Sequence, residues 1–257
     1  MTFNQLFDLK GKVAIVTGGG NGIGKACCET LAQAGAAIAV SDLKLQDAEA
    51  VAAQINSAGG KAIAVECNVT KDEDLVRLAE TTVSQQGGIH ILVNNAGGGG
   101  GGRENPFKIT VDDFAWVFKL NVFSAWRLSQ LCVPHMKKDG YGSIINITSM
   151  SSVNKSPNMS AYAASKAAMN HMTCNLAHDF GPEVRINAVG PGATKTAALA
   201  SVLTPQIEAT MLAHTPIKRL GEASDISGAV LYFAAPISEW VSGQVIFVNG
   251  GGVQTLD

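Results

Sequence analysis

The 257-residue sequence predicts an α/β protein: one doubly wound domain whose parallel sheet of about seven strands carries helices on both faces. Short, continuous apolar runs alternate along the chain with longer stretches of helical spacing. Continuous runs are typical of strands covered on both faces, and their alternation with helices indicates a parallel sheet with right-handed crossovers. The 28 glycines stand mostly at the ends of the apolar runs, where a strand must turn into a helix.

The expected elements follow one another in order. Runs rich in Val, Ile and Ala predict strands at 12–17, 37–41, 62–66, 90–94, 143–147, 184–189 and 244–248. Helical spacing predicts helices at about 22–34, 48–57, 71–86, 110–137 and 161–180, with another beginning near 224–225. Thr110 to Asp113 can cap the fourth of these helices.

One region breaks this rhythm, between residues 190 and 221. It holds Gly, Pro and Thr and only a short amphipathic piece, and so long an excursion in a compact domain is usually a lid or binding loop. We therefore expect one domain over residues 1–257, with a substrate lid at about 190–221.

Composition excludes several classes of protein. Hydrophobic residues make up 46% and charged residues 16%, which is unlike a disordered tail, and the net charge of −2 provides no basic surface for nucleic acid or an anionic membrane. The five cysteines form no C-x-x-C and suit the core of a protein in a reducing compartment. The first residues lack an apolar signal core, and no apolar run approaches the ~20 residues of a membrane span. These features predict a soluble cytoplasmic protein.

The sequence contains no motif for several other kinds of chemistry. The five histidines show no metal-ligand spacing, so we expect no metal, and both a Walker A sequence and the G-x-S-x-G elbow of hydrolases are absent.

The glycine-rich stretch from Thr17 to Gly24 joins the first strand to the first helix. Glycines let the backbone approach a pyrophosphate closely, and the following helix N-terminus directs N–H groups at the anion. The spacing is G-x-x-x-G-x-G rather than G-x-G-x-x-G, and such a stretch can also be an ordinary tight turn. Asp42, at the end of the second strand, can accept hydrogen bonds from both ribose hydroxyls, although it could also be a solvated turn residue. Its carboxylate repels a 2′-phosphate and so favours NAD over NADP; Lys44 is the only basic side chain nearby.

Tyr162 and Lys166 lie four residues apart near the start of a predicted helix, on one face. A phenol has a pKa of about 10, and a nearby ammonium together with a positive nicotinamide ring would lower it. Ser149 ends the fifth strand, where its hydroxyl could meet the phenol over a substrate oxygen or simply form a local turn or cap. Asn121 lies inside a helix, where Asn is a mediocre choice, so it is either a surface residue or a polar group that holds a water.

As a set, these motifs resemble the short-chain dehydrogenase/reductase family over nearly the whole chain. The Asn-Asn-Ala-Gly sequence at 94–97 and the Pro-Gly sequence at 191–192 belong to the resemblance. It implies a Rossmann-like fold, an NAD-dependent oxidoreductase, and a homotetramer built through the long helices near 110–138 and 160–180. It also implies four catalytic roles: acid/base for Tyr162, ribose binding and lowering of the tyrosine pKa for Lys166, a hydrogen bond to the reacting oxygen for Ser149, and a water in a proton relay for Asn121.

The resemblance further implies a set of cofactor contacts. Many members have Asp-Val near the adenine where this chain has Asn68-Val69, and an amide can still bond the adenine amino group. The stretch 194–196 is expected near the carboxamide. The implied cofactor residues are Gly18, Asn21, Gly22, Ile23, Gly24, Asp42, Leu43, Asn68, Val69, Asn95, Tyr162, Lys166, Thr194, Lys195 and Thr196.

Within this family, the sequences at 94–100, 147–150 and 214–221 and the C-terminal stretch are similar to the bacterial 7α-hydroxysteroid dehydrogenases. This similarity implies oxidation of the 7α-hydroxyl of a bile-acid steroid to a ketone. The residues implied to face the steroid are Gly99, Ser149, Asn154 and Tyr162.

The composition of the lid agrees with a bulky, flat, apolar ligand better than with a small polyol, whose hydroxyls would need many buried partners. The glycines at 97–102 leave room for such a ligand. The lid could instead pack its apolar side chains onto the domain or a neighbouring subunit. These side chains belong to Ala197, Ala198, Leu199, Val202, Leu203, Met211 and Leu212.

Other functions stay open at this stage. A polyol or gluconate dehydrogenase and a 3-oxoacyl-carrier-protein reductase belong to the same family, although Asp42 disfavours an NADPH-dependent reductase. A dinucleotide-sensing protein without turnover is a further alternative, against which the presence of Ser149, Tyr162 and Lys166 argues.

Overall fold

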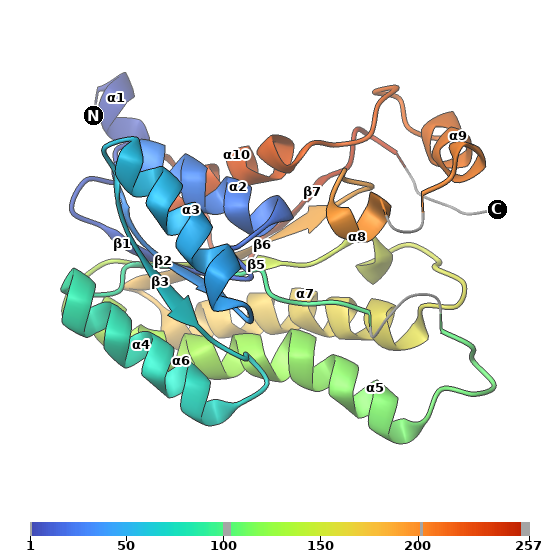
Figure 1. Cartoon of the computed structure of the whole chain (residues 1–257), viewed down its shortest axis with the longest axis horizontal. Coiled ribbons are helices and arrows are strands. Elements are labelled where there is room, and N and C mark those ends of the chain that lie inside the picture. Colours follow the sequence, from blue (N-terminus) through green and yellow to red (C-terminus); the bar gives the residue numbers. More distant parts are fainter. Residues whose placement is uncertain (1, 100–103, 201–202, 253–257) are drawn as a thin grey trace.

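The computed structural model describes residues 2–99, 104–200 and 203–252. Its seven strands form one parallel sheet in the order β3-β2-β1-β4-β5-β6-β7, which confirms the predicted fold class (Figure 1). Each predicted strand is present, with ends that differ by no more than two residues. The strands are β1 (Val13–Thr17), β2 (Ala37–Asp42), β3 (Lys61–Glu66), β4 (Ile91–Asn94), β5 (Gly142–Ile147), β6 (Val184–Pro191) and β7 (Val245–Val248).

Helices cover both faces of this sheet. One layer contains α2, α3 and α10, and the opposite layer contains α4, α5, α6 and α7 (Figure 1). The helices are α1 (Phe3–Leu6), α2 (Gly22–Gln33), α3 (Leu45–Ser57), α4 (Asp72–Gln86), α5 (Val111–Phe118), α6 (Ser124–Lys138), α7 (Ser160–Phe180), α8 (Ala197–Ala200), α9 (Pro205–Ala213) and α10 (Ala223–Ala234).

The continuous apolar runs are explained by a separate core on each face. In β1, Ala14 and Val16 pack in the layer of α2, α3 and α10, whereas Ile15 between them packs in the layer of α4, α6 and α7. All three side chains are fully buried. Because alternate residues of a strand point to opposite faces, a strand with two covered faces needs apolar residues at every position.

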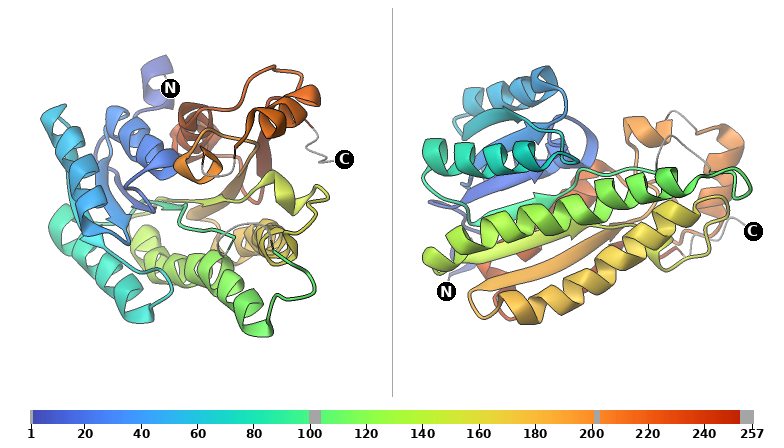
Figure 2. Two further views of the ribbon diagram at one scale, coloured as in Figure 1. Left: turned by 45° about the vertical axis from the view of Figure 1, so that its right-hand side comes forward. Right: turned by 90° about the horizontal axis from the view of Figure 1, so that it is seen from below.

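The fourth predicted helix starts at the expected cap but is not uniform. Thr110 and Asp113 form a capping box at the start of α5, as predicted. The helix then passes through a five-residue π-helical segment, Lys119–Phe123, before it continues as α6. Such segments often occur at functional sites, and Asn121 lies in the middle of this one. Figure 2 shows α5, α6 and α7 running along one side of the sheet.

The predicted lid begins too early in the sequence. Gly190 and Pro191 belong to β6, because they pair with Phe247 and Val248 of β7. The excursion therefore starts at Gly192. It contains α8 and α9, which lie at the end of the sheet where the strands terminate (Figure 1). No helix in the described ranges is long and apolar enough to cross a membrane.

Candidate active site

The glycine turn after β1 is held against the turn after β4. The Asn95 side-chain nitrogen donates to the carbonyl oxygens of Thr17 and Gly18, at 2.9 and 3.0 Å. Gly18 has a φ of +62°, and a Cβ on Gly24 would lie 2.0 Å from the Gly18 carbonyl oxygen, so neither position suits a side chain. These contacts fix the turn at the carboxyl edge of the sheet, between β1 and β4, where ligands bind in open α/β sheets.

The start of α2 fits an anion. Asn21 precedes the helix without making a side-chain capping bond, and the first turn contains no acidic residue. The first amides of α2 are therefore available for a pyrophosphate. A Cβ on Gly22 would lie 3.5 Å from Cγ2 of Thr196, so the backbone of this turn faces Thr196 with no side chain between them. Of the other predicted contacts here, Ile23 is partly buried and packs against the adjacent core.

Asp42 is buried at the end of β2, beside the same turn. Its Oδ2 accepts a hydrogen bond from the Gly20 amide at 3.0 Å, and its Oδ1 accepts one from the Lys44 amide at 3.1 Å. A Cβ on Gly20 would lie 2.9 Å from Oδ2, so only glycine lets the backbone pass so close. A carboxylate has about four acceptor positions, which leaves two for ribose hydroxyls. Leu43 beside it is 62% exposed, as a surface for an adenine ring would be.

The two residues predicted near the adenine are already engaged. The Asn68 side-chain oxygen accepts from both the amide and the hydroxyl of Thr70, at 3.0 and 2.7 Å. A bond to the adenine amino group would share this oxygen. Val69 is buried and packs in the core of the α4, α6 and α7 layer. Contacts of both residues with a cofactor stay predictions.

Tyr162, Ser149 and Lys166 come together at the carboxyl ends of β4 and β5. The Lys166 Nζ lies 5.8 Å from the centre of the Tyr162 ring and donates to the Ile147 carbonyl oxygen at 2.8 Å. Ser149 hydrogen-bonds Tyr162, and its Oγ also accepts from the Ser151 amide at 3.1 Å, so the hydroxyl is both a local cap and a partner of the phenol.

Burial dominates the electrostatics of this group. It raises the pKa of Tyr162, which the hydrogen bond from Ser149 only partly offsets, and it lowers the pKa of Lys166 to about 8. In the protein alone, the pKa of Tyr162 therefore lies above its ordinary value because of burial. A lowering that depends on the nicotinamide ring stays a prediction.

Asn121 ties the glycine-rich loop after β4 to α7. Its side-chain oxygen accepts from the Gly98 amide at 2.9 Å, and its nitrogen donates to the Gly98 carbonyl oxygen and to Ser165 Oγ, at 3.0 and 2.9 Å. Asn121 is fully buried, so it is no surface residue. Both side-chain N–H groups are used, whereas the side-chain oxygen keeps one acceptor position. The water of a proton relay stays a prediction.

The same loop passes over Tyr162. A Cβ on Gly99 would lie 3.5 Å from ring carbons of Tyr162, in ordinary contact. The loop thus leaves the space beside the phenol free of side chains as far as Gly99. The remaining glycines of the run, at 100–102, lie outside the described residues.

One functional candidate was missed by sequence reasoning. The Glu104 carboxylate accepts hydrogen bonds from the first turn of α7, including the Tyr162 amide at 3.1 Å. The only available signal was indirect: Met159, which precedes α7, cannot cap a helix with its side chain.

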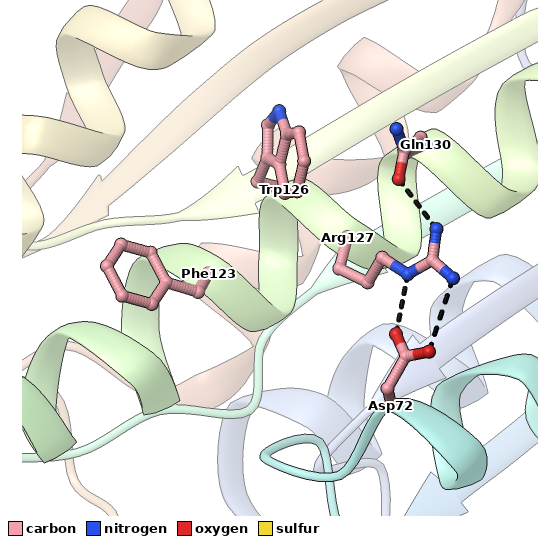
Figure 3. Close-up of a pocket in the computed structure, with 5 residues that line it drawn as sticks. All are labelled: Asp72, Phe123, Trp126, Arg127 and Gln130. Atoms are coloured by element: carbon pink, nitrogen blue, oxygen red, sulfur yellow. Dashed lines mark hydrogen bonds and ion pairs between the residues drawn. The ribbon is translucent and has the colours of Figure 1, made fainter.

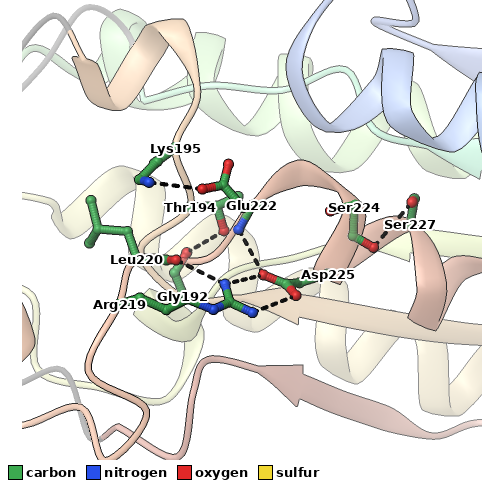
Figure 4. A network of polar contacts seen from close by, with 9 residues as sticks. All are labelled: Gly192, Thr194, Lys195, Arg219, Leu220, Glu222, Ser224, Asp225 and Ser227. Atoms are coloured by element: carbon green, nitrogen blue, oxygen red, sulfur yellow. Dashed lines mark hydrogen bonds and ion pairs between the residues drawn. The ribbon is translucent and has the colours of Figure 1, made fainter.

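The predicted stretch 194–196 lies at the base of the lid. Thr194 forms a bridge with Gly221, and Lys195 Nζ pairs with Glu222 Oε1 at 2.8 Å (Figure 4). Arg219 and Asp225 form a two-bond ion pair beside them, at 2.6 and 2.9 Å. A cofactor contact of Lys195 would compete with Glu222, and it stays a prediction.

The structure describes most, but not all, of the residues predicted to contact the substrate or line the lid. Asn154 follows the short 3₁₀ helix Met150–Ser152, and its amide donates to the Met150 carbonyl oxygen at 3.0 Å. The apolar lid side chains Leu199, Leu203, Met211 and Leu212 are all partly buried. Ala197 and Ala198 lie in α8, and Val202 lies outside the described residues.

A separate pocket lies on the outer surface of α4 and α6. It is lined by Asp72, Phe123, Trp126, Arg127 and Gln130 (Figure 3). Arg127 bonds both oxygens of Asp72, at 2.6 and 3.3 Å, while Phe123 and Trp126 are 55% and 45% exposed. No residue of the catalytic group lines this pocket. Across the described ranges, no three His, Cys, Asp or Glu side chains are grouped to hold a metal ion.

Comparison with known proteins agrees with this geometry. A family model described as enoyl-(acyl carrier protein) reductase matches residues 18–252. The 7alpha-hydroxysteroid dehydrogenase of Escherichia coli K12 is 49% identical over 250 residues, which is 97% of each chain, and that of Clostridium sardiniense is 37% identical over 95% of this chain and 94% of its own. A solved 7 alpha-hydroxysteroid dehydrogenase, complexed with NADH and 7-oxo glycochenodeoxycholic acid, is 48% identical over the whole of both chains with a TM-score of 0.96.

Proposed function

The chain belongs to the short-chain dehydrogenase/reductase family, and from this premise we propose that it is an NAD-dependent dehydrogenase that oxidises the 7α-hydroxyl of bile-acid steroids to a ketone. The observation that carries the proposal is the grouping of Tyr162, Ser149 and Lys166 beside the glycine turn. It occurs in a chain 48% identical to a structure that holds NADH and a 7-oxo steroid.

The residues present fit a dinucleotide. The glycine turn and the start of α2 would hold the pyrophosphate, Asp42 the adenosine ribose, and Lys166 the nicotinamide ribose. NAD⁺, when bound, supplies the hydride acceptor. The buried carboxylate of Asp42 would repel the 2′-phosphate of NADP, which supports a preference for NAD.

The chain's own groups manage the proton. Tyr162, in its phenolate form, would accept the proton of the steroid hydroxyl, while Ser149 donates a hydrogen bond to the same oxygen. Burial raises the pKa of Tyr162, so the phenolate needs a positive charge close by. We propose that Lys166 provides part of that charge, and that Asn121 acts here by fixing the loop at Gly98 and by the water of a proton relay.

We propose that the segment following β6 is the substrate lid. Its partly buried Leu199, Leu203, Met211 and Leu212 offer apolar surface to a steroid, and the side-chain-free backbone at Gly99 leaves room above Tyr162. Asn154 is the proposed polar contact at one end of the steroid.

A homotetramer in the cytoplasm completes the proposal. The exposed aromatic side chains of Trp116 on α5, Phe123 at the end of the π-helical segment and Trp126 on α6 support helix-to-helix contact between subunits. Size-exclusion chromatography with light scattering would test it, and a monomer would contradict it.

The function is tested by NADH formation at 340 nm with cholate and chenodeoxycholate, and with their 7β epimers. We expect oxidation of the 7α compounds only, because a 7β-hydroxyl in the same pose directs its carbinol hydrogen away from the nicotinamide. Equal rates on both epimers would remove the stereochemical claim. Activity on gluconate or a 3-hydroxyacyl ester, with none on either steroid, would assign the protein to another branch of the family.

A further inference from the structure

The helix that carries Tyr162 and Lys166 has no N-terminal cap of its own. Its preceding residue, Met159, makes no side-chain capping bond, and its first turn contains no acidic residue. The first amides of a helix have no partner within the helix, so a buried helix start needs acceptors from elsewhere. In α7 these acceptors matter for function, because Tyr162 lies in the first turn.

Glu104 supplies those acceptors from a distant part of the chain. Its Oε2 accepts from Ser160 Oγ at 2.7 Å and from the Ala161 amide at 3.0 Å, and its Oε1 accepts from the Tyr162 amide at 3.1 Å. Burial raises the pKa of Glu104, but the hydrogen bonds from these three residues outweigh it and lower the pKa below its ordinary value. The ionised carboxylate also suits the positive end of the helix dipole.

The backbone of Glu104 makes a second attachment at the same place. Its amide donates to the Asn158 carbonyl oxygen at 2.7 Å. Asn158 has a φ of +58°, in the left-handed region that Asn tolerates better than most residues. Glu104 therefore holds both the turn that leads into α7 and the first turn of the helix itself.

The other end of this loop is also tied to α7. Gly98 bonds the side chain of Asn121, which in turn donates to Ser165 Oγ in the second turn of the helix. Gly98, through Asn121, and Glu104 are thus both linked to α7, at Ser165 and at the first turn. Gly99, within that stretch, borders the phenol ring.

We propose that Glu104 is a positioning residue for catalysis: by capping α7 from across the loop, it fixes the direction in which Tyr162 presents its phenol to Ser149 and to the substrate hydroxyl. The proposal rests on the proposed function, because turnover is one of its readouts. Misplacement of a reacting group by about 1 Å can cost as much as 10²-fold in rate, so a loosened first turn is expected to affect kcat strongly.

The test compares three variants with the wild type. Glu104→Ala removes all three side-chain hydrogen bonds to the first turn of α7. Glu104→Gln keeps one oxygen that can accept from a backbone amide and gains an N–H group that can donate to the Ser160 hydroxyl. Asp113→Ala is the matched control, because Asp113 caps α5 through Thr110 and is not part of the catalytic group. Each variant is assayed for kcat, KM for NAD⁺, NADH affinity by fluorescence, and hydrogen exchange of the peptide that spans 159–165.

We expect kcat of Glu104→Ala to fall about tenfold or more, with NADH affinity and KM for NAD⁺ within about twofold of wild type. Exchange in the peptide that spans 159–165 should accelerate, Glu104→Gln should recover much of the kcat, and Asp113→Ala should keep it. A kcat of Glu104→Ala within twofold of wild type, despite faster exchange, would overturn the proposal. An equal loss in Asp113→Ala would overturn it too, because the effect would then be general destabilisation.

Failure of the proposed function would look different: the wild type itself would not oxidise the steroids. The hydrogen-exchange comparison would still decide whether Glu104 holds the first turn of α7, since unchanged exchange in Glu104→Ala would refute the cap. If Glu104→Ala does not fold, Glu104→Gln carries the same comparison with a smaller expected loss.

Discussion

Replacement of Gly97 by alanine should disrupt the catalytic group through a single methyl. A Cβ at this position would lie 2.7 Å from Asn121 Oδ1 and 3.2 Å from Lys166 Nζ. Both distances are shorter than ordinary contact, and both partners are buried at 0% and 3% exposure, so neither side chain has free space to move into. The backbone of Gly97 is not in the left-handed region, so the effect should come from the added methyl alone.

The size of the expected loss in stability follows from the hydrogen bonds that Asn121 makes. Its oxygen would have to leave the Gly98 amide, and any rotation of the amide group would also weaken the bonds to the Gly98 carbonyl and to Ser165. A buried polar group left without its partner costs about 1–3 kcal/mol. We expect the free energy of unfolding to fall by about that amount. We also expect kcat/KM to fall about tenfold or more, since the displaced groups adjoin Tyr162.

Urea denaturation and NADH formation at 340 nm measure the two effects. Gly98→Ala is the matched control, because among the described residues a Cβ there would meet only Leu120 Cδ2, at 3.9 Å. It should stay within about 0.5 kcal/mol of the wild type. If Gly97→Ala matched the wild type in both stability and kcat/KM, or if Gly98→Ala lost as much, the reasoning from close contacts in this loop would be refuted.

Three further predictions concern the proton, the cofactor and pH. Tyr162→Phe should lower kcat about 10²–10⁴-fold and keep NADH binding, measured by fluorescence; substantial turnover would contradict the acid/base role. Asp42→Ala should raise KM for NAD⁺ about tenfold and reduce the preference for NAD⁺ over NADP⁺, because hydrogen bonds to a charged group are worth about 1.5–3 kcal/mol. If the ratio of kcat/KM for NAD⁺ to kcat/KM for NADP⁺ stayed unchanged, that result would count against ribose binding by Asp42. Burial lowers the pKa of His90 below 6.5, and its Nδ1 accepts from the Val13 amide at 3.1 Å. The neutral form is therefore favoured by folding, so its contribution to stability is present above pH 6.5 and is lost as pH falls through the folded pKa. The fall in the free energy of unfolding between pH 7 and pH 5, measured by urea denaturation, should be smaller in His90→Gln than in the wild type. An equal fall in both proteins would exclude His90 as its cause.

Local sequence patterns were sufficient to predict the sheet and part of the candidate active site. The apolar run of β1 predicts a strand because Ala14, Ile15 and Val16 supply both faces. The helical spacing of Tyr162 and Lys166 places them on one face without knowledge of the fold. The early start of the lid shows where such patterns fail. The Gly-Pro sequence resembles the start of a loop, yet Pro191 ends β6 and the next amide, at Gly192, makes the last bond to Val248.

Contacts between distant segments were not predictable. Asn121 bonds Gly98 across 23 positions, and Glu104 bonds the start of α7 across 56 to 58. Neither pair belongs to a periodic pattern, so no local rule links the two partners. The π-helical segment around Asn121 likewise has no signal in the apolar spacing of α5 and α6. The raised pKa of Tyr162 depends on burial of the whole group, which a single spacing cannot show.

The bridge between Thr194 and Gly221 means that the chain leaves the sheet region and returns to it at one point. Lys195–Glu222 and Arg219–Asp225 reinforce this junction with two ion pairs (Figure 4). Everything between the two bridge positions is then a closed loop, whose length can vary at small entropic cost. On the proposed role of this segment as the substrate lid, its replacement would change the choice of substrate while the glycine turn and α7 keep their geometry. The proposed cofactor site and the proposed substrate-selecting segment would then lie in separate parts of the chain.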